Sequence, residues 1–269
     1  MSTNYRNFFG MKKEAFSGDL STKEIFETDD IRLVQERFEY AVRLGSAALV
    51  TGEIGSGKST ALRYVASKLH PSEYRPIHIT ACSGSILEFY RMVLAEMNID
   101  KSSTSRAVMI GLIKKEVKEL VLGKKLKVVL IIDEASLMRL EVFAELHTIT
   151  QFEQDSKPWL PIVLAGKTNL IDSLSYQSSM PLASRIVAKS HLEPASRSQM
   201  EEYLDHHLSI TGIKNSLFDD TAITAIHQGS GGLFRKANNL ARGAIVAAAH
   251  EQSMTVNAEH VRLASTEVF

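Results

Sequence analysis

A short glycine-rich segment could bind a phosphate group. Residues Gly52–Ser59 read Gly-Glu-Ile-Gly-Ser-Gly-Lys-Ser, which fits the pattern G-x-x-x-x-G-K-[ST]. Glycines at this spacing let the backbone wrap around a phosphate, with N–H groups pointing inward at the start of a helix. In this pattern Lys58 reaches the β- and γ-phosphates, and Ser59 ligates Mg²⁺. The residues expected to bind the nucleotide here are Gly52, Glu53, Ile54, Gly55, Ser56, Gly57, Lys58, Ser59 and Thr60.

A second group of residues could handle a metal ion and a water molecule. The run Val128–Ile132 is continuously apolar, and Asp133 and Glu134 follow it directly. Such a run is typical of a central parallel strand, and carboxylates at its carboxyl end lie where ligands of open α/β sheets bind. Together with the phosphate loop they predict an ATP site in which Asp133 holds Mg²⁺ and Glu134 activates the attacking water. The alternative is that the two carboxylates only cap the strand.

The elements that would position these residues alternate between strands and helices. Apolar runs predict strands at 47–50, 76–81, 128–132 and 160–165, and helical periodicity marks 31–44, 60–69, 85–97, 105–122 and 137–152. This alternation with one phosphate loop predicts an α/β fold, the doubly wound parallel sheet of a P-loop NTPase. After Glu193-Pro194 only helices are expected, at 197–210, 220–227, 234–250 and 258–268. They predict a small all-helical lid domain.

Three segments follow from this pattern. We expect a lead-in segment and helix over 1–45, a nucleotide-binding α/β domain over 46–193 and the helical lid over 194–269. The lead-in segment is rich in aromatic residues, which should pack it onto the body of the protein, although one could instead lie near the adenine. These residues are Tyr5, Phe8, Phe9, Phe16 and Phe26.

The composition is that of a soluble globular protein. The 269 residues include 31 lysines and arginines and 31 aspartates and glutamates, so the total charge gives no sign of nucleic-acid binding. Cys82 is the only cysteine, which excludes an intrachain disulfide and a cysteine-rich zinc site. The polar N-terminus predicts no signal peptide, and no apolar run approaches the ~18–20 residues of a membrane span. We therefore expect a cytoplasmic protein without a membrane partner.

A local cluster of lysines stands out against this balanced charge. Its side chains could contact the backbone of a nucleic acid. The alternative is a solvated helix face and turn. The cluster consists of Lys114, Lys115, Lys118, Lys124, Lys125 and Lys127.

Several motifs resemble one branch of the AAA+ ATPases. A phosphate loop, an Asp-Glu pair and a helical C-terminal region together look like an AAA+ ATPase. The opening Tyr5–Phe16, with an aromatic-glycine start followed by Ala-Phe, is similar to that of the ExeA/GspA-like ATPases. Asp133–Met138 resembles their Walker B motif, and Gln151–Ser156 followed by Leu160–Gly166 resembles the approach to their sensor-1 strand. Gly231–Asn238 resembles their sensor-2 region.

The resemblance implies roles for two arginines. Arg185, in Leu-Ala-Ser-Arg-Ile, stands where such ATPases place the arginine that reaches the γ-phosphate of a neighbouring subunit. A positive charge there would stabilise the transition state of hydrolysis. Arg235 matches the sensor-2 arginine that contacts the phosphates from the lid. Either residue could instead be a surface arginine in a salt bridge.

The sequence departs from the family after the sensor strand. Related ATPases often carry Gly-Gln-Pro-Glu-Leu, whereas this chain has Gly-Lys-Thr-Asn-Leu at 166–170. We include Asn169 among the nucleotide-binding residues, while Lys167 and Thr168 remain alternatives for the sensor of the γ-phosphate. A lysine at this place could alter hydrolysis or contact DNA.

The resemblance leaves the biological setting open between two main alternatives. Stand-alone relatives resemble ATPases encoded beside transposases, with a role like that of MuB and TnsC. They imply a homo-oligomer, a ring or filament, that assembles with ATP on duplex DNA without sequence preference and recruits a transposase. In secretion-type relatives the same module belongs to a longer chain with a membrane span, and the end of this sequence just after the lid favours transposition. A small-molecule kinase and a slowly hydrolysing nucleotide-bound scaffold are further alternatives.

Overall fold

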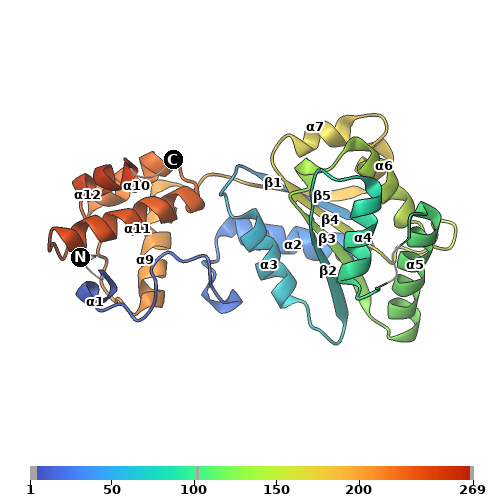
Figure 1. The fold of residues 1–269 in the computed structure, drawn as a ribbon, viewed down its shortest axis with the longest axis horizontal. Coiled ribbons are helices and arrows are strands. Elements are labelled where there is room, and N and C mark those ends of the chain that lie inside the picture. The colour runs from blue at the N-terminus through green and yellow to red at the C-terminus, as the bar shows by residue number, and fades with distance from the viewer. Residues whose placement is uncertain (1–4, 101–102, 267–269) are drawn as a thin grey trace. The chain divides into compact units, whose positions relative to one another are not determined.

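The computed structural model describes residues 5–100 and 103–266 and divides the chain into two compact units (Figure 1). The sheet unit consists of Asp29–Gly52 and Lys58–Leu192. The helical unit consists of Glu53–Gly57 and the described parts of Met1–Thr28 and Glu193–Phe269.

The sheet unit is built on five parallel strands in the order β2-β3-β4-β1-β5. They are β1 (Ala47–Gly52), β2 (Tyr74–Thr80), β3 (Lys127–Asp133), β4 (Ile162–Gly166) and β5 (Ile186–Leu192). Every residue of β1 and β4 is buried, and β3 is buried after its first residue. Burial on both faces explains why these strands are unbroken apolar runs in the sequence.

Helices cover both faces of this sheet (Figure 1). On one face lie α2 (Asp29–Leu44) and α3 (Lys58–Lys68), and on the other lie α4 (Ile86–Glu96), α5 (Arg106–Lys118) and α6 (Leu140–Ile149). Short segments complete the unit: η2 (Glu119–Gly123), η3 (Ala135–Leu137), α7 (Leu170–Ser175) and α8 (Met180–Ala183). The predicted doubly wound P-loop NTPase fold is confirmed.

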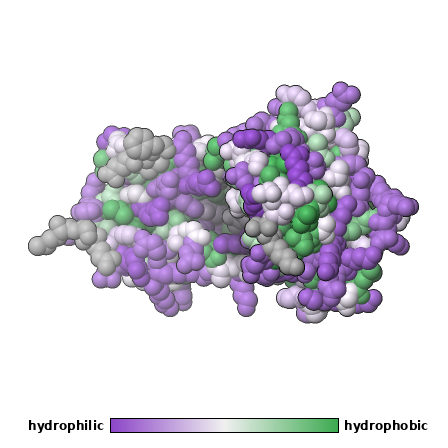
Figure 2. All heavy atoms as spheres, turned by 45° about the vertical axis from the view of Figure 1, so that its right-hand side comes forward, coloured by the Kyte–Doolittle hydropathy of each residue, from purple (hydrophilic) through white to green (hydrophobic). Residues whose placement is uncertain are grey.

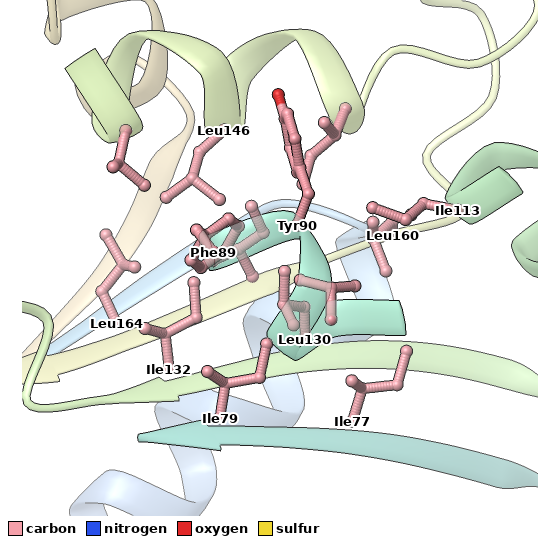
Figure 3. Close-up of a cluster of buried hydrophobic side chains, with 14 of the residues drawn as sticks. Ile77, Ile79, Phe89, Tyr90, Ile113, Leu130, Ile132, Leu146, Leu160 and Leu164 are labelled. Atoms are coloured by element: carbon pink, nitrogen blue, oxygen red, sulfur yellow. The ribbon is translucent and has the colours of Figure 1, made fainter. Parts of the chain in front are cut away.

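The main core lies between the sheet and the second helical layer. In Figure 3, alternate residues of the strands, such as Ile79, Ile132 and Leu164, point toward Phe89 of α4 and Leu146 of α6. This alternation is the period-2 pattern of a strand meeting the stripe of an amphipathic helix. The sheet is thereby held as a rigid base for the loops at its ends.

The sequence analysis predicted neither strand β5 nor the short helices α7 and α8. Strand β5 alternates buried and exposed positions, with Lys189 and His191 facing solvent. It lies at the edge of the sheet, beside β1 only. An edge strand with polar side chains on one face lacks the continuous apolar run that revealed the central strands.

The helical unit packs four helices and the start of the chain around a second core. Its elements are α1 (Tyr5–Phe9), η1 (Thr22–Glu24), α9 (Arg197–Thr211), α10 (Asp220–Ser230), α11 (Phe234–His250) and α12 (Ala258–Ser265). Phe16 stacks on the buried His207 with 5.2 Å between ring centres, and Phe9 belongs to the same core. Positions 267 and 268 of the last predicted helix lie outside the described residues.

The structure divides the predicted segment 1–45 between the two units. Residues up to Thr28 belong to the helical unit because their aromatic side chains fill its core. Helix α2 belongs to the sheet unit, where it packs against β1 and β5. In the described part of the chain, no helix combines the length and apolarity needed to cross a membrane.

Candidate nucleotide-binding site

The phosphate loop, the Asp-Glu pair and the segment after the sensor strand all start at the carboxyl edge of the sheet. Strand β4 pairs with both β1 and β3, with Thr51 opposite Gly166 and Ile132 opposite Leu164. Because all strands are parallel, the segments after Gly52, Asp133 and Gly166 leave the same edge. This is where open α/β sheets bind ligands.

Lys58, the first residue of α3, is held at this edge by the end of strand β1. Its Nζ donates to the carbonyl oxygen of Gly52 over 2.9 Å, and only 6 % of the residue is exposed. Ser59 follows as an exposed residue in the first turn of α3, whose leading N–H groups have no partner within the helix. This arrangement offers an ammonium, a hydroxyl and a helix N-terminus to an anion.

The loop between Gly52 and Lys58 has a backbone that can surround an anion. Gly55 and Gly57 have φ of +88° and +99°, which glycine adopts without a Cβ penalty. The buried Oγ of Ser56 has no hydrogen-bond partner among the described residues. A buried hydroxyl without a partner costs stability, so the loop fits a group that brings oxygen acceptors, as a phosphate does.

Asp133 and Glu134 are arranged differently from each other at the end of β3. Asp133 is 5 % exposed, and its Oδ1 accepts the backbone N–H of Glu134 over 2.8 Å. Glu134 has the left-handed conformation φ 52°, ψ 31°, which costs a non-glycine residue about 1–3 kcal/mol. Such strain concentrates at functional sites because the surroundings must impose it.

The metal-binding residues suit Mg²⁺ in combination with phosphate oxygens. Among the described residues, no group of three His, Cys, Asp or Glu side chains could hold a metal ion alone. Mg²⁺ is usually bound through one or two carboxylates together with substrate phosphates rather than by a protein cage. Asp133 and Ser59 therefore fit Mg²⁺ as partners of a bound nucleotide.

Of the three residues left open after the sensor strand, Lys167 has a hydrogen bond to the segment that follows Glu134. Its backbone N–H donates to Oγ of Ser136, two residues after Glu134, over 3.3 Å, and Lys167 is half-buried. Thr168 and Asn169 are exposed, and Asn169 precedes α7 without a capping bond from its side chain. Lys167, Thr168 and Asn169 therefore remain the three alternatives for the γ-phosphate sensor.

The close approach of these two loops depends on Gly166. A Cβ on Gly166 would lie 2.9 Å from the backbone nitrogen of Ser136 and 3.1 Å from a methyl group of Leu170. The segment after β4 therefore packs directly on the loop that carries Glu134. In the sequence, the only sign of this contact is a small residue at the end of a strand.

One polar contact at this edge was missed by the sequence analysis. The buried Thr51 hydroxyl lies 2.8 Å from Nδ1 of His191, next to the loop that starts at Gly52. Thr51 is the residue of β1 that pairs with His191 of β5. Without recognition of β5, no local pattern in the sequence joins these two residues.

Arg185 lies at the opposite edge of the sheet. Its carbonyl oxygen accepts from the N–H of Ala47, the first residue of β1, and it directly precedes β5. Its guanidinium forms an ion pair with Asp155 over 2.6 Å. The sequence analysis named Arg185 but missed Asp155.

The loop that carries Asp155 is locally strained. Glu153, Gln154 and Asp155 all have positive φ, at 46°, 59° and 66°. The hydrogen bond from Arg185 holds the pKa of the Asp155 carboxyl below its usual range. Nearby, burial and then the charge of Arg185 lower the pKa of His147, while Asp155 opposes them.

Arg235 lies in the helical unit, at the start of α11. Its backbone N–H donates to the carbonyl oxygen of Gly55 over 3.2 Å, and its side chain is exposed. A Cβ on Gly55 would lie 2.9 Å from Cβ of Arg235, so the two segments pack closely. The resemblance predicts that this guanidinium contacts phosphates.

The structure separates the predicted lysine cluster into parts. Lys114, Lys115 and Lys118 line a hollow of about 530 Å³ beside α5. Lys127 lines a different hollow, where its ammonium lies 5.0 Å from the ring centre of Tyr74. The cluster is therefore not one continuous basic surface.

Comparisons with known proteins agree with this fold. Residues 42–174 match the family model described as "AAA domain". The chain is 28 % identical over 267 residues to general secretion pathway protein A of Aeromonas hydrophila. That match covers 98 % of this chain and 48 % of the relative, so the chain spans about half the length of that protein.

Solved structures with the same fold share little sequence. Cdc6p from Pyrobaculum aerophilum superimposes with a TM-score of 0.75 at 15 % identity, covering 94 % of this chain and 70 % of its own. The Aeropyrum pernix ORC1 protein, solved in complex with DNA, gives 0.69 at 16 % identity, covering 94 % and 68 %. Taken with the phosphate loop and the Asp-Glu pair, these matches support an ATP-hydrolysing P-loop enzyme with the AAA+ fold.

Proposed function

We propose that this protein is an ATP-driven switch whose protomers share their nucleotide sites, assemble on duplex DNA and regulate transposition. The ATP site of one protomer would be completed by Arg185 of the next protomer. Assembly would then depend on ATP, and hydrolysis would loosen it. In this account ATP controls timing, so turnover is slow.

The roles of the residues at the carboxyl edge follow from their chemistry. Lys58 binds the β- and γ-phosphates, and the loop from Gly52 to Thr60 wraps around them. Ser59 and Asp133 hold Mg²⁺, which when bound polarises phosphate oxygens as a Lewis acid. Glu134 orients the attacking water and accepts its proton. One of Lys167, Thr168 and Asn169 senses the γ-phosphate. Arg235 contacts the phosphates from the helical unit.

The position of Arg185 is the observation that carries the shared site. Arg185 lies at the amino edge of the sheet, and the phosphate loop leaves the carboxyl edge. The six residues of β1 that separate these edges span roughly 17 Å at ~3.3 Å per residue, too far for its guanidinium to reach its own Lys58. An arginine that stabilises the transition state from this edge must act on a second copy of the chain.

The DNA and transposition parts of the proposal rest on similarity. A structural neighbour was solved in complex with DNA, and the sequence resembles ATPases that assist transposases. Lysines on one helix could neutralise phosphates of any sequence, which makes binding salt-dependent and nonspecific. The partners we propose are therefore duplex DNA, further copies of the chain and a transposase.

A second candidate is favoured by one comparison. The relative from Aeromonas hydrophila is named for the general secretion pathway. In that setting the same ATP switch would act in assembly of a secretion apparatus and would not bind DNA.

DNA binding in defined nucleotide states separates the two candidates. Purified protein is mixed with duplexes of unrelated sequence, without nucleotide, with ADP and with a non-hydrolysable ATP analogue, across a salt series. The proposal predicts assembly that requires the ATP analogue and weakens with salt, seen as rings or filaments by electron microscopy. If no duplex is bound in any state, the transposition proposal fails and the secretion candidate takes its place.

A further inference from the structure

One hollow outside the nucleotide site has the charge and shape of an anion-binding surface. We define the α5 hollow by Gly111, Lys114, Lys115 and Lys118 of α5 and by residues 151–154 after α6. Its volume is about 530 Å³. In Figure 2, which turns the α5 side of Figure 1 forward, hydrophilic residues cover the right-hand flank of the sheet unit.

The hollow carries an excess of positive charge. Among the described residues, Lys118 pairs with Glu153 over 2.9 Å, while Lys114 and Lys115 have no ion-pair partner. The ammonium of Lys114 lies 5.8 Å from the ring centre of Phe152, and its burial lowers the pKa of Lys114. Three lysines against one carboxylate leave a net charge that an anionic ligand would neutralise.

The lining favours phosphates over other anionic ligands. Phe152 is 5 % exposed, so it offers no face on which a nucleic-acid base could stack. The remaining lining residues are lysines, glutamines, a glutamate and Gly111, which provide no apolar pocket to anchor a peptide side chain. Lys114 and Lys118 are one helical turn apart, so their ammonium groups can meet successive phosphates on one strand.

The wall of the hollow is also the loop that holds Arg185. Glu153 contacts Lys118 at one end of the loop, and Asp155 contacts Arg185 at the other. Glu153, Gln154 and Asp155 are all left-handed, a conformation that only its surroundings can maintain. A ligand that takes Lys118 from Glu153 removes one of the contacts that maintain it.

We propose that the α5 hollow binds the phosphodiester backbone of duplex DNA and that binding releases Arg185 from Asp155. Phosphates replace Glu153 at Lys118, the loop relaxes and the guanidinium becomes available to a neighbouring protomer. This inference rests on the proposed function, since it names the DNA contact and the regulation of the shared site. Protomers would thereby assemble with one another when they are bound to DNA and not when they are free in solution.

A matched pair of variants tests the binding site. The hollow variant, Lys114→Gln with Lys115→Gln, removes two charges from the hollow. The turn variant, Lys124→Gln with Lys125→Gln, removes two charges from the turn after η2. Binding of a fluorescent duplex is measured across salt concentrations with the ATP analogue, and thermal melts verify folding. Log K for duplex binding falls with log salt, and we expect this fall to be less steep by about 2 in the hollow variant. The turn variant should keep the wild-type slope.

A further variant at Gly111 tests the same hollow without removing a lysine. A Cβ at Gly111 would meet nothing within 4 Å, so Gly111→Glu adds a carboxylate to the hollow without a clash. It should weaken duplex binding at least tenfold relative to Gly111→Gln, which has the same shape. Equal binding by these two variants contradicts the proposed site.

The remaining outcomes separate this inference from the proposed function. If wild-type protein binds no duplex, both fail together. If wild-type protein binds duplex and the hollow and turn variants lose the same slope, only the inference fails. If polyglutamate displaces DNA as effectively as polyphosphate does, the hollow binds acidic protein segments instead.

A variant of Glu153 tests the proposed link between the hollow and Arg185. Glu153→Gln should raise ATP turnover several-fold in the absence of DNA, and unchanged turnover contradicts the release of Arg185.

Discussion

Arg185 and Lys58 lie at opposite edges of one parallel sheet. The carbonyl of Arg185 accepts from the first residue of β1, and the ammonium of Lys58 donates to the carbonyl of Gly52, the last residue of that strand. Within one chain these two cations cannot meet the same phosphate. Their separation is the reason to expect a nucleotide site completed by a second protomer.

Glu134→Gln should separate ATP binding from hydrolysis. The amide keeps the shape of the side chain but cannot accept a proton from water, so turnover should fall about 100- to 10,000-fold. Binding of a fluorescent ATP analogue, measured by titration, should stay within about twofold of wild type, a difference under ~0.5 kcal/mol. Turnover that survives this change would remove Glu134 from the proposed mechanism.

Gly166→Ala should disturb hydrolysis through the backbone. The new Cβ would press on the nitrogen of Ser136, and crowding of this kind costs about 1–3 kcal/mol. The loop that carries Glu134 should shift, which lowers turnover more than ATP affinity. Steady-state ATPase assays over a range of ATP concentrations measure turnover and KM, and thermal melts measure the loss of stability. Gly18→Ala is the control because a Cβ at Gly18 meets nothing within 4 Å.

Asp155→Asn should make Arg185 available at lower protein concentration. The ion pair competes with the neighbouring protomer for the guanidinium, so its loss should lower the protein concentration of half-maximal turnover a few-fold. ATPase activity measured over a protein dilution series gives this concentration. A rise in that concentration would mean that Asp155 supports Arg185 rather than restraining it.

The buried His207 should make the protein less stable in mild acid. Burial, followed by the charges of His206 and Lys13, lowers the pKa of His207 from 6.5 to about 4. Because the unfolded chain binds this proton more readily, stability is complete above pH ~6.5 and falls as the pH drops toward 4. The full loss is roughly 3 kcal/mol at ~1.36 kcal/mol per pKa unit.

Urea unfolding at pH 7 and pH 5 measures the part of that loss that falls between these two pH values, roughly 2 kcal/mol. His207→Leu should reduce the difference between the two pH values because it removes the titrating group. An unchanged difference in this variant would assign the acid sensitivity to other groups.

The sequence predicted the parts of the site that are contiguous in the chain. Gly52–Ser59 and Asp133-Glu134 each combine a buried apolar strand with a loop whose residue types are dictated by phosphate or metal chemistry. A single local pattern therefore holds both the element and its function. The same logic recovered the central strands and the long helices.

Contacts between distant segments could not be predicted in this way. Strand β5 is a half-polar edge strand, so Thr51 and His191 gave no joint signal. The pairing of Arg185 with Asp155 depends on three left-handed residues in a row, a conformation that non-glycine residues rarely adopt and that no local pattern indicates. These contacts are set by tertiary packing rather than by propensity.

Mixing two inactive variants tests the shared site most directly. Lys58→Ala removes the phosphate contact, and Arg185→Ala removes the arginine, so each alone should lose at least about 1,000-fold in turnover. In an equal mixture about one interface in four combines an intact Lys58 with an intact Arg185 from its neighbour. The account predicts that the mixture recovers about a quarter of wild-type turnover at assembling concentrations. A mixture as inactive as its two components would contradict a site completed by Arg185 of a second protomer.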